Sequence, residues 1–155
     1  MEFSDSDFGG DKETRISVAG FIIYLMGVPI RCRSKGQKSV VLSSSEAEYV
    51  TLSEAAREFK FIYQVLISLN FTVKLPIFNL ENLGAIFMSE NVSISTKTKH
   101  VDIRYGFVQE FVLDGFLKIN FVRTKMNDAD IFTKNLGGVL YNCHSRKMIT
   151  EKGKN

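Results

Sequence analysis

Residues 43–69, SSSEAEYVTLSEAAREFKFIYQVLISL, contain the strongest structural signal in the sequence. Ser43 is followed three residues later by Glu46, which is the capping-box pattern of a helix N-terminus, where the serine hydroxyl accepts a backbone N–H. Downstream, apolar residues recur at steps of three and four, the spacing of one helical face. They are Leu52, Ala55, Phe59, Ile62, Leu66 and Leu69. The pattern predicts a helix of about seven turns that ends near Asn70.

Extended segments flank this helix on both sides. Before it, three runs separated by glycines predict an antiparallel meander, at residues 1–7, 17–26 and 28–33. After it, residues 74–79 and 117–122 predict two further strands. Further helices are expected at residues 82–89, 99–113 and 128–134. This mixture predicts an α/β fold, in which helices pack against a sheet.

The composition is that of a soluble globular domain. The chain has 155 residues and a mass of 17.5 kDa, with 45% hydrophobic and 24% charged residues, which suits one domain. Apolar runs such as residues 20–26 are too short to span a membrane, and no secretory signal is recognised. Two distant thiols, Cys32 and Cys143, argue against a disulfide scaffold or a zinc finger. We therefore expect an intracellular, non-secreted monomer, in the cytoplasm or the nucleus, with no membrane partner.

Several carboxylates are candidates for one site. Glu48 lies four residues before Leu52, on the apolar face of the long helix, where burial is costly unless the carboxylate is paired, protonated or bound to a cation. Alternatively, Glu48 is half solvated in the first turn and stabilised by the helix dipole. Strand ends and helix starts of an open α/β sheet meet at one edge, and further acids stand at such positions: Asp5, Asp7, Glu81 and Asp130. Grouped carboxylates suit Mg²⁺ or Mn²⁺.

Four segments occur in one order along the chain: residues 3–11 (FSDSDFGGD), 41–58 (VLSSSEAEYVTLSEAARE), 97–105 (KTKHVDIRY) and 128–136 (DADIFTKNL). Together they resemble the motifs of the ribonuclease H domain of copia-type retrotransposon Pol polyproteins. The resemblance implies a ribonuclease H-like α/β fold, with a five-stranded mixed sheet of three antiparallel strands and then parallel additions, flanked by helices. Residues 1–137 are expected to form this domain, and residues 138–155 a C-terminal helical extension and tail.

The same resemblance implies a metal-dependent endoribonuclease that hydrolyses the RNA strand of RNA–DNA hybrids. In the parent polyprotein its partner would be an upstream reverse transcriptase domain. Carried over motif by motif, the metal-binding and catalytic carboxylates fall on Asp5, Glu48, Glu81 and Asp130. Their cofactors would be two Mg²⁺ (or Mn²⁺) ions about 3.5–4 Å apart, which clamp the attacking water and the leaving oxygen.

One motif departs from the family pattern. Residues 81–85 read ENLGA, whereas the family usually has DNQSA there. Glu81 keeps the charge of the usual aspartate but adds a methylene, and catalytic groups tolerate displacements of only about 0.5 Å. A second interpretation therefore stays open, namely a catalytically impaired or inactive ribonuclease H-like relic that binds nucleic acid weakly or not at all.

Nucleic-acid contacts are expected from two groups of residues. By motif, 2′-hydroxyl and backbone contacts fall on Ser44, Ser45 and Asn82. The basic runs would neutralise phosphates without reading sequence, through Arg31, Arg33, Lys99 and Arg104. His100 is either a substrate contact or a surface histidine near a helix start. His144 matches no motif and is expected to be solvated in the tail.

Overall fold

The computed structural model describes residues 1–8, 16–37, 41–91 and 99–149, and only the backbone of residues 99–105 within them. The five strands are β1 (Glu2–Asp7), β2 (Val18–Leu25), β3 (Val28–Gly36), β4 (Ile77–Leu80) and β5 (Lys118–Phe121). The four α-helices are α1 (Ser44–Ser68), α2 (Leu83–Glu90), α3 (Lys99–Leu113) and α4 (Gly138–Met148), and two short 3₁₀ helices are η1 (Thr124–Met126) and η2 (Asp128–Phe132). No helix in these described ranges is long and apolar enough to cross a membrane.

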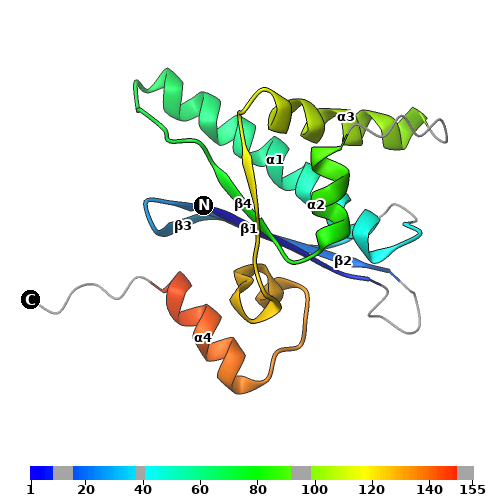
Figure 1. Ribbon diagram of the computed structural model, residues 1–155. Coiled ribbons are helices and arrows are strands. Elements are labelled where there is room, and N and C mark those ends of the chain that lie inside the picture. Colours follow the sequence, from blue (N-terminus) through cyan, green and yellow to red (C-terminus); the bar gives the residue numbers. More distant parts are fainter. Residues whose placement is uncertain (9–15, 38–40, 92–98, 150–155) are drawn as a thin grey trace, which may run out of the picture.

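The strands form one mixed sheet in the order β3-β2-β1-β4-β5. The first three pair antiparallel, whereas β4 pairs parallel with both β1 and β5. Helices α1, α2 and α3 lie on one face of the sheet, and η2 with α4 lies on the other (Figure 1). The expected five-stranded mixed α/β sheet is therefore confirmed.

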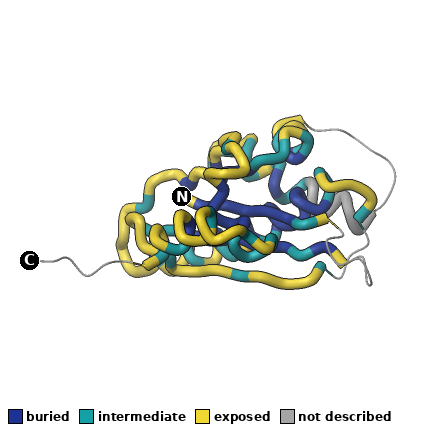
Figure 2. The backbone as a smooth tube through the Cα atoms, turned by 90° about the horizontal axis from the view of Figure 1, so that it is seen from below, coloured by how far each residue is buried: buried dark blue, intermediate teal, exposed yellow. Residues whose placement is uncertain are grey.

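Helix α1 anchors the main core. The Ser43 hydroxyl accepts the Glu46 N–H at 3.1 Å, and the Glu46 carboxylate accepts the Leu42 N–H at 2.7 Å, so the predicted helix start is correct. Its inner face buries Tyr49, Leu52 and several further residues against the apolar side chains of β2 and β4. Burial of each large side chain contributes about 1.5–3 kcal/mol. Figure 2 shows the buried residues in the interior, between the exposed outer segments.

The close approach of η2 to the sheet depends on a glycine. Gly20 on β2 is the direct partner of Asp5 on β1. A Cβ atom at Gly20 would lie 2.6 Å from Thr133 Cγ2 and 2.8 Å from Phe132 Cβ, distances that real contacts do not reach. The missing side chain at residue 20 therefore lets η2 and the residues after it lie directly against the strand that carries Asp5. Residues 128–132 form a 3₁₀ helix within the helical region predicted at residues 128–134.

The C-terminal helix corrects one prediction. His144 was expected to be solvated, but its side chain on α4 is fully buried. His144 Nδ1 lies 2.8 Å from Asp128 Oδ1, Lys147 Nζ donates to the same oxygen at 2.6 Å, and the Tyr24 hydroxyl donates to Asp128 Oδ2 at 3.2 Å. These four residues are called the Asp128 cluster. A buried carboxylate needs hydrogen-bond donors, and α4 supplies two of them, which places His144 in the interior.

Candidate metal centre

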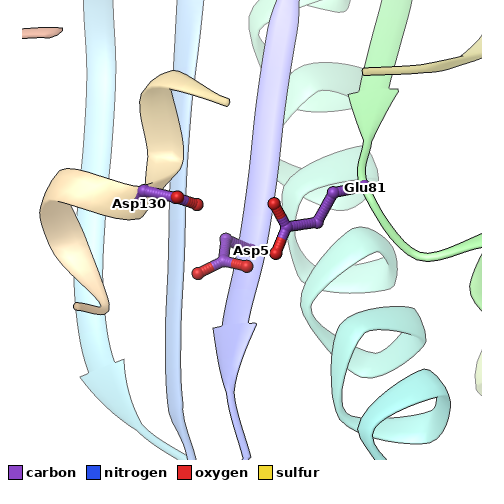
Figure 3. A group of neighbouring side chains, drawn as sticks. All are labelled: Asp5, Glu81 and Asp130. Carbon is purple, nitrogen blue, oxygen red and sulfur yellow. The ribbon is translucent and has the colours of Figure 1, made fainter. Parts of the chain in front are cut away.

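Three acidic side chains from three distant elements point toward one another. Asp5 lies within β1, Glu81 directly follows β4, and Asp130 lies in η2 (Figure 3). One oxygen atom from each carboxylate lies within 4.8 Å of the others. Parallel pairing of β1 with β4 brings Glu81 to the edge where Asp5 lies, and the approach of η2 adds Asp130 from the opposite face. The structure thus brings together three of the four carboxylates predicted from the sequence.

An ammonium group lies among these three carboxylates. Lys134 Nζ is 3.2 Å from Asp5 Oδ1, 2.8 Å from Glu81 Oε1 and 3.1 Å from Asp130 Oδ1. The Thr133 hydroxyl donates a hydrogen bond to Asp5 Oδ2, so both oxygens of that carboxylate have donors. Neither Lys134 nor Thr133 was predicted from the sequence as a site residue. The available signal was that Lys134 lies four residues after Asp130 within the fourth motif.

Glu48 lies beside the trio rather than within it. Its side chain on α1 is buried, and the charges of Asp5 and Glu81 act on it. Burial, followed by these two charges, raises the pKa of Glu48 from its ordinary value of 4.5 to about 8, although a hydrogen bond from Asn82 opposes the shift. Glu48 Oε2 is buried without a hydrogen-bond partner among the described residues. The fourth predicted carboxylate is therefore close enough to interact electrostatically and has an oxygen free to bind a ligand.

Burial also shifts the pKa values of the other ionisable groups in the cluster. It raises the pKa of Asp5, against hydrogen bonding by Thr133 and the charge of Lys134. Burial and then the charge of Asp5 raise the pKa of Asp130 to about 7. For Lys134, burial lowers the pKa, but the hydrogen bond to Glu81 and the nearby carboxylates outweigh it, and the net pKa is raised. The carboxylates therefore outnumber the positive charge that Lys134 provides, and their mutual repulsion is only partly relieved.

The donor set fits divalent metal ions. Carboxylate oxygens are the ligands that Mg²⁺ and Mn²⁺ prefer. Besides Glu48 Oε2, Glu81 Oε2 is buried without a hydrogen-bond partner in the described part of the chain, so one oxygen on each of these two carboxylates stays unsatisfied there. Such orphaned oxygens are costly in a protein interior unless a cation or donor approaches them. The position of the Lys134 ammonium marks where a cation is held in this cluster.

The predicted nucleic-acid contacts fall at several places. Ser44 is exposed in the first turn of α1. The Ser45 hydroxyl donates to Asn82 Oδ1 at 2.9 Å, and that oxygen also accepts the Ala85 N–H at 3.1 Å to cap α2. Ser45 and Asn82 are thus joined next to Glu48 and Glu81, on the rim of the carboxylate cluster.

The two predicted arginines have acidic partners within the chain. Arg31 forms an ion pair with Glu58 at 3.3 Å, and Arg33 forms one with Glu54 at 3.5 Å. Both pairs link β3 to α1 and are partly solvated. Exposed pairs of this kind are worth about 0–1 kcal/mol, so they leave the guanidinium groups able to exchange partners. Lys99, His100 and Arg104 belong to α3, but their side chains lie outside the described residues.

The raised pKa values predict how stability changes with pH. The folded chain keeps protons on Glu48 and Asp130 at pH values where the unfolded chain has lost them, because their folded-state pKa values are about 8 and about 7. The folded state therefore binds more protons in this interval, and stability falls as pH rises from about 5 to 8. Glu48 alone should account for roughly 3 kcal/mol of this fall.

Thermal unfolding in the presence of a metal chelator measures this effect. We expect Tm to decrease as pH rises across this interval, and Glu48→Gln to flatten the decrease because the amide does not ionise. Glu110→Gln, on the exposed side of α3, is the matched control and should leave the slope unchanged. A Tm profile that rises with pH in the natural chain would contradict the assignment of raised pKa values.

The chain is similar to plant transposon proteins over most of its length. The chain is 35% identical over 147 residues, 94% of its length, to the retrovirus-related Pol polyprotein from transposon RE2 of Arabidopsis thaliana. It is also 35% identical over 132 residues, 85% of its length, to the corresponding polyprotein from transposon TNT 1-94 of Nicotiana tabacum. The chain spans only about a tenth (10%) of the length of each relative. No model of a known protein family matches the chain.

A solved structure shares the fold. A ribonuclease H1 isolated from compost by a metagenomic approach superimposes with a TM-score of 0.63 at 13% sequence identity. The match covers 85% of this chain and 90% of that protein. The identity is too low to transfer an activity, but the coverage shows that the sheet and its helices are arranged as in ribonuclease H.

Proposed function

The chain belongs to the copia-type transposon Pol polyproteins, as a segment with the ribonuclease H-like fold, and we propose that it hydrolyses the RNA strand of RNA–DNA hybrids with divalent metal ions. The observation that carries this proposal is the meeting of Asp5, Glu81 and Asp130 from three distant elements, with Glu48 beside them. A buried cluster of like charges is costly to the fold, and cation binding is the function that such a cluster serves best. The upstream reverse transcriptase as partner and an intracellular location belong to the same proposal.

The residues of the site would have different roles in this reaction. Asp5, Glu48, Glu81 and Asp130 would hold the metal ions, which supply an activated water and stabilise the leaving oxygen. Thr133 orients the Asp5 carboxylate by donating to Oδ2. The fixed positions of β1, β4 and α1 keep the carboxylates in place before substrate arrives, so little reorganisation is needed during the reaction.

Residues at the rim of the carboxylate cluster would contact the substrate. Ser44, Ser45 and Asn82 offer hydroxyl and amide groups, which suit the 2′-hydroxyls of an RNA strand. Arg31 and Arg33 lie on β3, where their guanidinium groups would exchange their carboxylate partners for phosphates. Lys99, His100 and Arg104 would add contacts from α3. These assignments predict binding by shape and charge rather than by base sequence.

Cleavage of a labelled hybrid tests the proposed function. The RNA strand carries the label, and matched RNA–RNA and DNA–DNA duplexes serve as substrate controls. We expect Mg²⁺- or Mn²⁺-dependent cleavage of the hybrid only, and none after addition of a chelator or with Glu48→Gln. A natural chain that leaves the hybrid intact with either metal would favour the alternative of an inactive relic.

Glu81→Asp separates an impaired enzyme from a fully competent one. Glu81 Oε1 reaches Lys134 Nζ at 2.8 Å, but Glu81 Oε2 has no hydrogen-bond partner, so the longer side chain is held at one oxygen only. A misplacement of about 1 Å can cost roughly 100-fold in rate. Shortening the side chain restores the family's aspartate at the same charge, and we expect cleavage to increase about tenfold.

Single-turnover cleavage by both proteins measures this difference, with Mn²⁺ and Mg²⁺ compared. The control is Glu110→Asp, which makes the same chemical change on an exposed part of α3. Equal rates for the natural chain and Glu81→Asp would mean that glutamate positions the metal as well as aspartate does. The impaired-enzyme interpretation would then be wrong.

A further inference from the structure

Lys134 occupies the position between the three carboxylates. Its Nζ lies 2.8–3.2 Å from one oxygen each of Asp5, Glu81 and Asp130. These are the same three side chains whose oxygens lie close enough together to share a metal ion. The lysine ammonium and a metal ion would therefore compete for the same three carboxylates, and like charges at such short range repel strongly.

The Lys134 side chain is anchored at its base but can move its ammonium group out of the carboxylate cluster. The backbone N–H of Lys134 donates to the Asp130 carbonyl at 2.9 Å, which fixes the base of the side chain at the end of η2. The stem has four flexible carbons, so Nζ can move without any change in η2. About 28% of the side chain is exposed, whereas Asp5 is fully buried. Asp130 is 3% and Glu81 16% exposed, so Lys134 is the most solvent-accessible side chain of the four.

Lys134 also relieves the repulsion in the cluster. Asp5, Glu81 and Asp130 lie together in a largely buried place, where unpaired like charges destabilise the fold. Lys134 is the only basic side chain among the described residues that forms ion pairs with these three acids. Without it, the metal-free carboxylates would keep only hydrogen bonds such as that from Thr133.

We propose that Lys134 is an internal counter-ion of the metal centre, which neutralises the carboxylates when metal is absent and is displaced when a divalent metal ion enters. The inference rests on the proposed function, because it needs the carboxylates to bind metal. Lys134 is thus a positioning residue. It stabilises the cluster of carboxylates when no metal is bound, and it weakens metal binding because it competes with the metal ion for the same carboxylates.

Calorimetric titration of the natural chain and of Lys134→Met with Mn²⁺ tests the proposal. Methionine keeps the length of the side chain but removes the charge. We expect the Mn²⁺ dissociation constant of Lys134→Met to be about tenfold lower, since removal of a competitor strengthens binding, and its metal-free Tm to be lower. Lys74→Met, at an exposed position outside the cluster, controls for the change in net charge and should match the natural chain.

A second measurement uses the natural chain and does not depend on the folding of a variant. Lysine-selective methylation followed by mass spectrometry reports whether each amine is free. Lys134 should be protected without metal and become several-fold more reactive in millimolar Mn²⁺, whereas Lys74 should react equally in both conditions. Protection of Lys134 that persists at saturating Mn²⁺ would overturn the proposal.

The outcomes separate this inference from the proposed function. Equal or weaker Mn²⁺ binding by Lys134→Met would overturn the counter-ion role and leave metal-dependent cleavage standing. Absence of Mn²⁺ binding by both the natural chain and Lys134→Met would overturn both proposals. Tighter binding by Lys134→Met in a chain that fails to cleave hybrids would support the counter-ion role and count against the proposed ribonuclease activity alone.

Discussion

Replacement of Asp5 by asparagine is expected to lower the rate of hybrid cleavage by at least about 1000-fold, which corresponds to roughly 4 kcal/mol of transition-state stabilisation. Asp5 lies between Glu81 and Asp130 and is fully buried in β1. An amide presents one neutral oxygen in place of a carboxylate, so the charge that attracts a divalent ion is lost at the centre of the cluster. Bound metals supply several kcal/mol of charge stabilisation, and most of it should disappear.

The change should leave the fold intact. Asparagine is nearly isosteric with aspartate, and its loss of charge reduces repulsion from Glu81 and Glu48. We therefore expect the metal-free Tm of Asp5→Asn to equal or exceed that of the natural chain, while the rise in Tm on adding Mn²⁺ shrinks, since metal stabilises only a folded state that binds it.

Asp7→Asn is the matched control for this experiment. Asp7 lies two residues further along β1 and is less buried than Asp5. Asp7 does not belong to the group of three acids. The Asp7→Asn variant should therefore cleave hybrids at a rate within a few-fold of the natural chain. Natural activity in Asp5→Asn would exclude Asp5 as a metal ligand. Equal losses in both variants would point to a general disturbance of β1.

Replacement of Asp128 by alanine is expected to destabilise the fold by about 3 kcal/mol, because it removes the acceptor of a largely buried hydrogen-bond network. Asp128 joins η2 to α4 through His144 and Lys147, and to β2 through Tyr24. Alanine would leave the buried His144 Nδ1 without its partner, and His144 Nε2 already has none among the residues that the structure describes. For a chain of this size the Tm should fall by roughly 10 °C.

Urea unfolding of Asp128→Ala against the natural chain gives the free energy directly. Lys147→Met is the control, since the Lys147 side chain is 39% exposed and its loss should cost less than 1 kcal/mol or so. A loss below about 1 kcal/mol for Asp128→Ala would mean that α4 adds little to the fold. Residues 138–155 would then behave as the separate extension expected from the sequence.

The structural features that could be predicted from the sequence alone are local ones, such as a helix start, or ones that recur at regular spacing within a single helix or strand. The start of α1 follows from Ser43 and Glu46, three residues apart. The apolar spacing also predicts the buried part of its inner face, at Leu52, Ala55 and Phe59, whereas Leu69 at the end of the predicted face is exposed. Both depend on contacts within a few residues, which a sequence displays directly. Acidic residues at predicted strand ends and helix starts were likewise visible in the sequence, but the choice of Asp5, Glu48, Glu81 and Asp130 rested on the resemblance of the motifs to those of the ribonuclease H domain.

The side chains that satisfy the buried carboxylates could be identified only in the folded chain. Thr133 and Lys134 reach Asp5 across 128 and 129 positions of the chain, and Tyr24 reaches Asp128 across 104. His144 is interior for the same reason: the need of buried Asp128 for donors outweighs the polar character of the sequence around α4. Local spacing predicts elements, but it carries no information on which distant donor a buried charge will find, because that choice depends on how η2 and α4 lie against the sheet.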